Sequence, residues 1–203
     1  MTSKVRVEGA RREAKKDEEA RPHLSERLFE SRQIQLFGPV DDKLARRIIS
    51  ELLALEAADK KAPITIFVNS PGGSVTAGFS IFDVMRFVRP EVRVVCSGLV
   101  ASIGTVILLG APKKSRLSLP NTRLLIHQPM IPSTVYGPAS DLEITARELL
   151  KTRARINELL STETGQPPER IELDTQRDYW MTAEEAVEYG LLAKVIHKRS
   201  DLG

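Results

Sequence analysis

The sequence predicts an α/β fold in which helices pack against a largely parallel sheet. Segments rich in β-branched residues alternate with amphipathic helical segments from Gln33 to Leu109. This order indicates right-handed strand–helix–strand units, in which successive strands pair in parallel. The chain has 203 residues, 41% of them hydrophobic, so it is long enough for one domain with a substantial core.

The first three strands are predicted over Gln33–Phe37, Ile64–Val68 and Val92–Ser97. Asp41 is a suitable N-cap for the helix that joins the first two. The apolar stripe of this helix comprises Leu44, Ile48, Ile49, Leu52, Leu53 and Leu55. Its spacing is that of a helix with one buried face.

A second helix is predicted from about Ser74 to Pro90, after the turn Asn69–Gly73. Gly72 and Gly73 permit positive φ and a close approach of the backbone to another group. An ordinary tight turn explains the two glycines equally well. In parallel sheets, however, sites lie at the carboxyl ends of the strands, where this turn falls.

The run Val94–Leu109 passes from a Val-rich strand through a bend into a buried helix, and it places Ser102 near the helix start. Amides at a helix start lack intrahelical acceptors, and they favour a developing negative charge. Ser102 is therefore a candidate nucleophile. A simple N-cap serine is the alternative that this residue alone leaves open.

The second half of the chain contains a predicted strand over Arg123–Ile126, and His127 follows it directly. A long helix is expected over about residues 141–162, with Asp141 as its cap. Thr182–Glu185 is a capping box that opens a helix ending at Gly190. The last strand is expected over Leu191–Ile196.

Composition excludes several classes of protein. The 30 basic and 27 acidic residues give a net charge of +3, so nucleic-acid and membrane binding receive little support. No apolar run is long enough to cross a bilayer, and the N-terminus lacks a signal core, so we expect a cytoplasmic protein. The single cysteine and the spacing of the three histidines predict neither an internal disulfide nor a metal site. Residues 1–26 are highly charged, and we expect a flexible or docking segment there, followed by one domain over residues 27–198.

A serine nucleophile needs a base, a group that orients the base, and amides for the oxyanion. His127 is the histidine at a strand end and is the candidate base. Spacing alone does not choose between the carboxylates of Asp141, Asp174 and Asp178. Cys96 is a second candidate nucleophile, but a thiol inside a Val-rich strand is expected to be buried and inert.

Four stretches resemble the proteolytic subunit family of the Clp protease, ClpP. They are FVNSPGGSVTAG (67–78), GLVASIGTVILLGA (98–111), LPNTRLLIHQP (119–129) and DTQRDYWMTAEEAVEYGL (174–191). The similarity runs from about residue 28 to residue 197. It implies a crotonase-like fold of repeated β-β-α units, with a protruding handle helix over about residues 140–163.

The resemblance implies an ATP-dependent serine peptidase with catalytic residues Ser102, His127 and Asp178. It assigns the oxyanion hole to the amides of Gly73 and Ile103. Substrate would bind along a small set of neighbouring residues: Gly72, Ser74, Val75 and Met130, with the Ile103 side chain in the apolar pocket.

The resemblance also implies an assembly of two stacked seven-membered rings that degrades unfolded proteins. An AAA+ unfoldase would consume the ATP, so the chain itself needs no cofactor. Departures from the family pattern suggest a divergent paralogue with a second ClpP-like subunit as partner. They lie in the N-terminal segment, at Thr65, in the proline-rich stretch 130–138 and at Gln176.

Two other functions remain open. One is a ring subunit with a structural or regulatory role and little activity alone, which the altered stretch after His127 favours. The other is a crotonase-type acyl-CoA enzyme, which would use backbone amides and would not need the three side chains.

Overall fold

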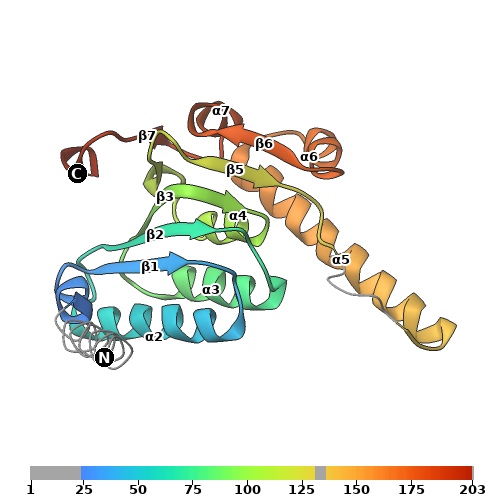
Figure 1. Ribbon diagram of the computed structural model, residues 1–203, viewed down its shortest axis with the longest axis horizontal. Coiled ribbons are helices and arrows are strands. Elements are labelled where there is room, and N and C mark those ends of the chain that lie inside the picture. Colours follow the sequence, from blue (N-terminus) through green and yellow to red (C-terminus); the bar gives the residue numbers. More distant parts are fainter. Residues whose placement is uncertain (1–23, 131–135, 203) are drawn as a thin grey trace, which may run out of the picture.

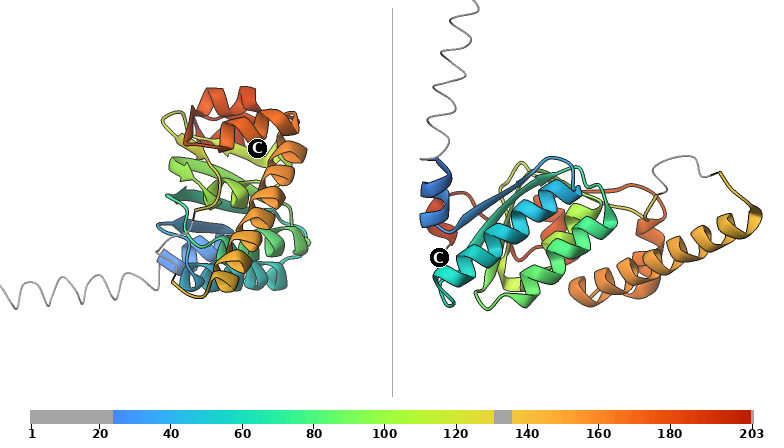
Figure 2. Two further views of the ribbon diagram at one scale, coloured as in Figure 1. Left: turned by 90° about the vertical axis from the view of Figure 1, so that its right-hand side faces the viewer. Right: turned by 90° about the horizontal axis from the view of Figure 1, so that it is seen from below.

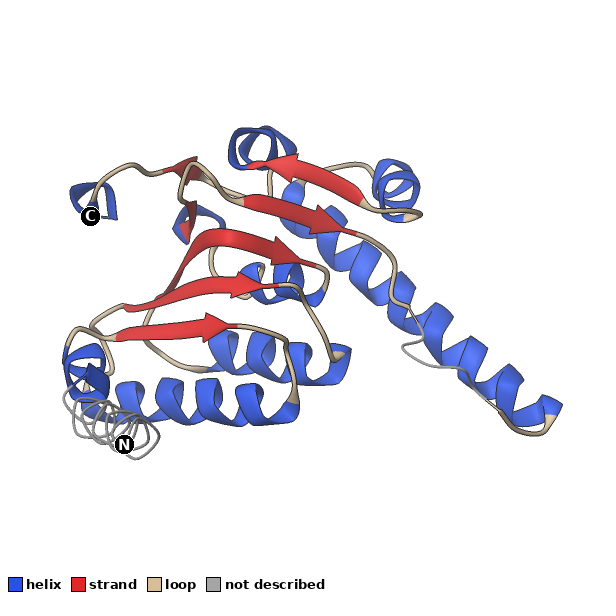
Figure 3. Ribbon diagram, in the orientation of Figure 1, coloured by secondary structure: helices blue, strands red, loops and turns tan. Residues whose placement is uncertain are grey.

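The computed structural model describes residues 24–130 and 136–202, and it has the α/β architecture that the sequence predicts (Figures 1 and 3). The strands in this part of the chain are β1 (Gln33–Phe37), β2 (Ile64–Ser70), β3 (Val92–Ala101), β4 (Arg116–Ser118), β5 (Arg123–Ile126), β6 (Tyr179–Thr182) and β7 (Lys194–Val195). The α-helices labelled in Figure 1 are α2 (Asp42–Ala58), α3 (Val75–Phe87), α4 (Ile103–Leu108), α5 (Ala139–Thr164), α6 (Pro168–Thr175) and α7 (Ala183–Tyr189). Residues 24–30 are also helical, so the boundary expected between residues 26 and 27 falls inside a helix. Most of the charged segment 1–26 lies outside the described residues.

The sheet is parallel from β1 through β2, β3 and β4 to β7. β3 changes neighbours along its length. Its residues Val94–Cys96 pair with β4, whereas Leu99–Ala101 pair with β5. β6 then runs antiparallel to β5. The carboxyl ends of β2, β3 and β5 consequently lie at the same edge of the sheet, where ligands bind in α/β proteins.

Local sequence signals explain the first helices. The side chain of Asp41 accepts a hydrogen bond from the Leu44 N–H at 2.7 Å and so caps α2. Ser74 caps α3 in the same way, accepting from the Ala77 N–H at 3.3 Å. Such caps satisfy amides that the helix leaves without acceptors. The buried face of α2 is narrower than the predicted stripe, because Leu53 is exposed.

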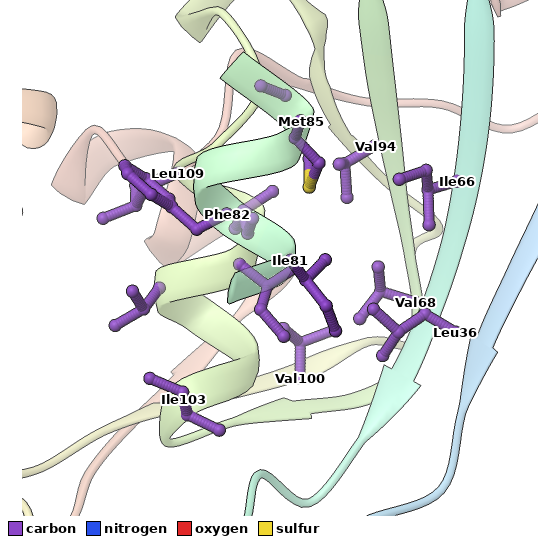
Figure 4. Close-up of a cluster of buried hydrophobic side chains, with 14 of the residues drawn as sticks. Leu36, Ile66, Val68, Ile81, Phe82, Met85, Val94, Val100, Ile103 and Leu109 are labelled. Atoms are coloured by element: carbon purple, nitrogen blue, oxygen red, sulfur yellow. The ribbon is translucent and has the colours of Figure 1, made fainter. Parts of the chain in front are cut away.

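The main core lies between the sheet and helices α2, α3 and α4 (Figure 2). Leu36, Ile66 and Val68 on the strands face the side chains of α3 (Figure 4). The α3 members of this cluster include Ile81, Phe82 and Met85. Each of these side chains is buried, and burying one large apolar side chain contributes roughly 1.5–3 kcal/mol.

Two predicted strand boundaries and one predicted helix cap are wrong. β3 continues through Ser97 and Gly98 to Ala101, because the expected turn is a bulge inside the strand. α5 begins at Ala139 after Pro138, so Asp141 lies in the first turn and is not the cap. The last strand is only Lys194–Val195, and the N–H groups of Leu191 and Leu192 instead donate to the Ala186 carbonyl of α7.

Helix α5 projects from the sheet, as Figures 1 and 2 show. Ile156 and Leu160 in its C-terminal half are buried against the core. In its N-terminal half, Leu142, Ile144 and Leu150 are exposed. A protruding helix with apolar side chains in solvent is typical of an element that packs against another molecule.

None of the helices over residues 24–130 and 136–202 is both long enough and apolar enough to cross a membrane.

Candidate active site

The bulge in β3 directs the chain toward the site. The β2–β3 register moves from Val68 opposite Cys96 to Ser70 opposite Val100. Gly98 has φ +65° within this bulge, and the Asn69 side chain accepts a hydrogen bond from the Leu99 N–H at 3.2 Å. The bulge therefore moves the end of β3 from β4 toward β5, and a bulge is a common way to re-aim a residue at a strand end.

Ser102 follows β3 directly and has an unusual backbone conformation, with φ 57° and ψ −126°. A positive φ is strained for a residue with a side chain, and such strain often marks functional sites. The hydroxyl makes no capping hydrogen bond to α4, which argues against a simple N-cap serine. The Ser102 N–H instead donates to the Leu125 carbonyl of β5 at 2.9 Å, so Ser102 is tied to the strand that leads to His127.

The glycine turn approaches Ser102 closely. A Cβ atom on Gly72, which has φ +94°, would lie 2.6 Å from the Cβ of Ser102. A Cβ atom on Gly73 would lie 2.3 Å from the carbonyl O of Val40. Only glycine fits in either place, which explains the pair of glycines better than an ordinary tight turn does.

The ring of His127 lies between Ser102 and Asp178. The distance from His127 Nε2 to Ser102 Oγ is 2.8 Å, and the distance from His127 Nδ1 to Asp178 Oδ1 is 3.2 Å. The histidine side chain is 11% exposed and that of Asp178 is 61% exposed. Three residues from distant parts of the sequence thus form a continuous chain of polar contacts.

The other two carboxylates have different surroundings. Asp174 lies on α6 and accepts hydrogen bonds from Arg170 Nε at 2.6 Å and from the Tyr189 hydroxyl at 2.9 Å. Burial and this contact with Asp174 raise the pKa of the Tyr189 hydroxyl. Asp141 lies in the first turn of α5. The geometry therefore selects Asp178 as the partner of His127.

Cys96 does not contribute to this arrangement. Its side chain is fully buried inside β3, and burial raises the pKa of the thiol. A buried neutral thiol is a poor nucleophile. Over the two described ranges, no group of three or more His, Cys, Asp or Glu side chains is arranged to hold a metal ion.

A cavity of about 650 Å³ adjoins His127. Its lining residues include Met130, Arg177 and Asp178, and the Met130 side chain is 69% exposed. Met130 is therefore available to a ligand. Ile103, by contrast, is only 2% exposed, and a Cβ on Gly78 of α3 would lie 2.1 Å from its Cγ1. The Ile103 side chain thus belongs to the core in this structure, contrary to its expected place in an apolar pocket.

The other expected substrate contacts are accessible to different degrees. Ser74 is exposed, although its hydroxyl also caps α3, and Val75 is half-buried. The Gly72 N–H donates to the hydroxyl of Ser70 at 3.1 Å, and this contact stabilises the turn. Their role in binding stays a prediction.

The sequence patterns did not identify the residues whose hydrogen bonds hold the site segments in place. Asn69 and Ser70 lie in the predicted turn with no role of their own, and in the structure they hold the bulge and the glycine turn. Gln128 follows His127, and both its main chain and its side chain contact the segment that carries Asp178. The sequence signal for these three residues is their position beside Gly72, Gly73 and His127.

The chain is similar to known proteins over most of its length. The family model described as Clp protease matches residues 16–199. The ATP-dependent Clp protease proteolytic subunit 3 of Rhizobium etli is 47% identical over 175 residues, which cover 86% of this chain and 89% of that protein. The protein of the same name from Rhizobium johnstonii is 46% identical over the same length and coverage.

Proposed function

Because the chain belongs to the Clp protease family, we propose that it is a proteolytic subunit of an ATP-dependent compartmentalised serine protease. In this proposal it hydrolyses peptide bonds of unfolded proteins with Ser102 as nucleophile, His127 as base and Asp178 as orienting group. The continuous contact from Ser102 through His127 to Asp178 carries the proposal.

The first chemical step is transfer of the acyl group to serine. With the imidazole proton on Nδ1, this N–H donates a hydrogen bond to Asp178, and Nε2 is free to accept the proton of the Ser102 hydroxyl. Oγ attacks the peptide carbonyl, and His127 then gives the proton to the leaving amine. Water, activated by the same nitrogen, hydrolyses the acyl-enzyme and restores Ser102.

The oxyanion of the intermediate would accept hydrogen bonds from the amides of Gly73 and Ile103. The Val40 N–H donates to the Gly72 carbonyl, and the Ser74 N–H donates to the Val40 carbonyl. These two bonds form a parallel bridge between Val40 and Gly73. The N–H of Gly73 is not used in this bridge and points away from Val40. It would therefore point toward the end of β3, where Ser102 lies. Ile103 is the first residue of α4, so the helix offers no acceptor for its amide.

Substrate would lie beside Gly72, Ser74, Val75 and Met130. The main chain there offers hydrogen bonds that do not depend on substrate side chains, which suits a peptidase of broad specificity. The exposed thioether of Met130 provides an adaptable apolar contact.

The assembly and partners form a further part of the proposal. The protruding N-terminal half of α5, with its exposed leucines and isoleucine, would act as the handle between two seven-membered rings. A Clp-type AAA+ unfoldase would use ATP, since the sequence contains no Gly-x-x-x-x-Gly-Lys phosphate loop. The reaction needs no metal or organic cofactor of this chain. We propose a cytoplasmic location.

Peptide turnover by the purified chain tests the proposal. Ser102→Ala should abolish hydrolysis of a small apolar fluorogenic peptide and leave the particle mass unchanged. Ser50→Ala is the matched control, because Ser50 is exposed on α2 and its hydroxyl donates only to the Arg46 carbonyl there. Equal turnover by the wild-type and Ser102→Ala proteins would remove Ser102 from the mechanism.

A subunit with little activity alone is the second candidate. The exposure of Asp178 favours it, because 61% of a side chain that orients the base lies in solvent in the single chain. A neighbouring subunit that covers this carboxylate would strengthen its contact with His127. Activity that appears only when a second ClpP-like subunit is added would support this candidate, whereas full activity of the chain alone would exclude it.

A further inference from the structure

Gln128 joins the two segments that carry His127 and Asp178. Its main-chain N–H donates to the Thr175 carbonyl at 2.6 Å. Its side-chain Nε2–H donates to the Gln176 carbonyl at 2.8 Å. Gln128 directly follows His127, and Gln176 lies two residues before Asp178. One residue therefore holds together two segments that are 48 positions apart in the sequence.

The Thr175 end of this connection is firmly held. Thr175 is buried, and its hydroxyl lies 2.8 Å from the Ile171 carbonyl on α6 and 3.1 Å from Asn157 Oδ1 on α5. The main-chain bond from Gln128 thus fixes the end of β5 to both helices. It does not by itself fix Asp178, which lies three residues further on.

Asp178 is held more weakly. Its side chain is 61% exposed, and its 3.2 Å contact with His127 Nδ1 is at the long end of the hydrogen-bond range. Water competes for such a carboxylate. Only Arg177 separates Asp178 from Gln176, and each residue extends the chain by at most about 3.6 Å. Fixing the Gln176 carbonyl therefore limits how far Asp178 can move from the ring.

We infer that Gln128 is a positioning residue, whose side-chain amide holds the Gln176 carbonyl and so keeps Asp178 within reach of His127. This inference rests on the proposed function, because it assigns to Asp178 the orientation of the base. Gln128 acts through Asp178 and takes no part in proton transfer.

Two variants remove the side-chain contact. Gln128→Glu keeps the length of the side chain, but an ionised carboxylate cannot donate to the Gln176 carbonyl. Gln128→Ala removes the side chain and retains the main-chain bond to Thr175. Each should lower kcat for a fluorogenic peptide about tenfold, with little change in KM, because a lost orientation affects the chemical step.

Gln166→Ala is the matched control. Gln166 Nε2 also donates to a main-chain carbonyl, that of Tyr189 at 3.0 Å, but it connects the end of α5 to the end of α7. Its loss should leave kcat within about twofold. If Gln128→Glu, Gln128→Ala and Gln166→Ala had the same kcat, the Gln128 side chain would have no specific effect on catalysis and the inference would be wrong.

A double-mutant cycle tests the route through Asp178. In an Asp178→Ala background, Gln128→Ala should change kcat by less than about twofold, because the group that it positions is absent. An equal tenfold loss in both backgrounds would show that Gln128 acts independently of Asp178 and would overturn the inference.

Crystal structures separate this inference from the proposed function. If Ser102→Ala hydrolyses peptides as well as the wild-type protein, the proposed function fails, and the positions of the side chains still decide the role of Gln128. In Gln128→Ala, the mean distance from His127 Nδ1 to Asp178 Oδ1 should lengthen beyond about 3.5 Å, so that the hydrogen bond is weakened. In Gln166→Ala it should remain near 3.2 Å. An unchanged contact in Gln128→Ala would refute the positioning role.

Discussion

Replacing Gly72 by alanine should disable the site while the protein stays folded. Gly72 has φ +94°, and an added Cβ would lie 2.6 Å from Ser102 Cβ and 2.9 Å from the Ala101 carbonyl. Gly38 has a similar φ of +89°, but a Cβ there would have no neighbour within 4 Å. Gly38→Ala therefore carries the same backbone strain without the collision, which makes it a matched control.

The magnitudes follow from these contacts. Ordinary van der Waals contact begins at 3.4 Å, so Ser102 and Gly72 must separate by 3.4 − 2.6 = 0.8 Å. A displacement of about 1 Å can reduce catalysis by roughly 10²-fold. The left-handed conformation costs about 1–2 kcal/mol in both variants. The collision adds about 1–3 kcal/mol in Gly72→Ala alone.

The assay is peptide hydrolysis per folded particle, together with urea unfolding of both variants. Gly72→Ala should lose about 10²-fold in kcat/KM, and Gly38→Ala should retain wild-type kcat/KM with only the smaller loss of stability. Equal kcat/KM in the two variants would show that the glycine turn does not determine the position of Ser102.

Four further predictions concern the fold and the assignment of the site. Glu163→Ala should lower the free energy of unfolding in urea by about 3–5 kcal/mol, because it leaves the 1% exposed Arg116 without its carboxylate partner. Glu143→Ala is the control: it breaks an exposed pair with Arg147 on the same helix and should cost less than about 1 kcal/mol. Similar losses in the two variants would contradict this prediction. Burial raises the pKa of Glu163, but hydrogen bonds from Arg116 and Arg86 outweigh burial and hold that pKa below its usual value. The stability that this group contributes is therefore present above the unfolded pKa and lost as the pH falls below about 4.3. As the pH is lowered, the unfolding midpoint should fall more steeply in the wild type than in Glu163→Gln, and parallel curves would argue against this. Because burial raises the pKa of the Cys96 thiol, an aromatic disulfide reagent should react only after unfolding, and rapid reaction of the native protein would show that the strand opens. Asp178→Asn should lower kcat about 10⁴-fold, whereas Asp174→Asn should leave kcat nearly unchanged because Asp174 contacts Arg170 and Tyr189; the reverse order would move the orienting role to Asp174.

Short-range signals in the sequence were sufficient for much of the fold. β1 and β5 have the predicted bounds, and Asp41 and Ser74 cap the predicted helices. These features depend on residues within a few positions of one another. The strand-end rule also brought attention to Ser102, since it needs only the order of strands and helices.

Long-range contacts decide what the sequence left open. Ser97 and Gly98 have the composition of a turn, but pairing with β2 and β5 makes them a bulge within β3. Asp174 and Asp178 are only four positions apart, and their different partners depend on where α6 ends. The contact of Gln128 with Gln176 spans 48 residues, and no local pattern predicts it.

If His127 activates Ser102 for attack on a carbonyl, Ser102 should react with electrophiles faster than other serines do. The mass of the intact chain after treatment with a fluorophosphonate, followed by peptide mapping, tests it most directly. We expect one adduct on Ser102 in the wild-type protein, and none on this residue in His127→Ala over the same time. Labelling of Ser102 at the same rate in both proteins, or an adduct at another residue with Ser102 unmodified, would contradict it.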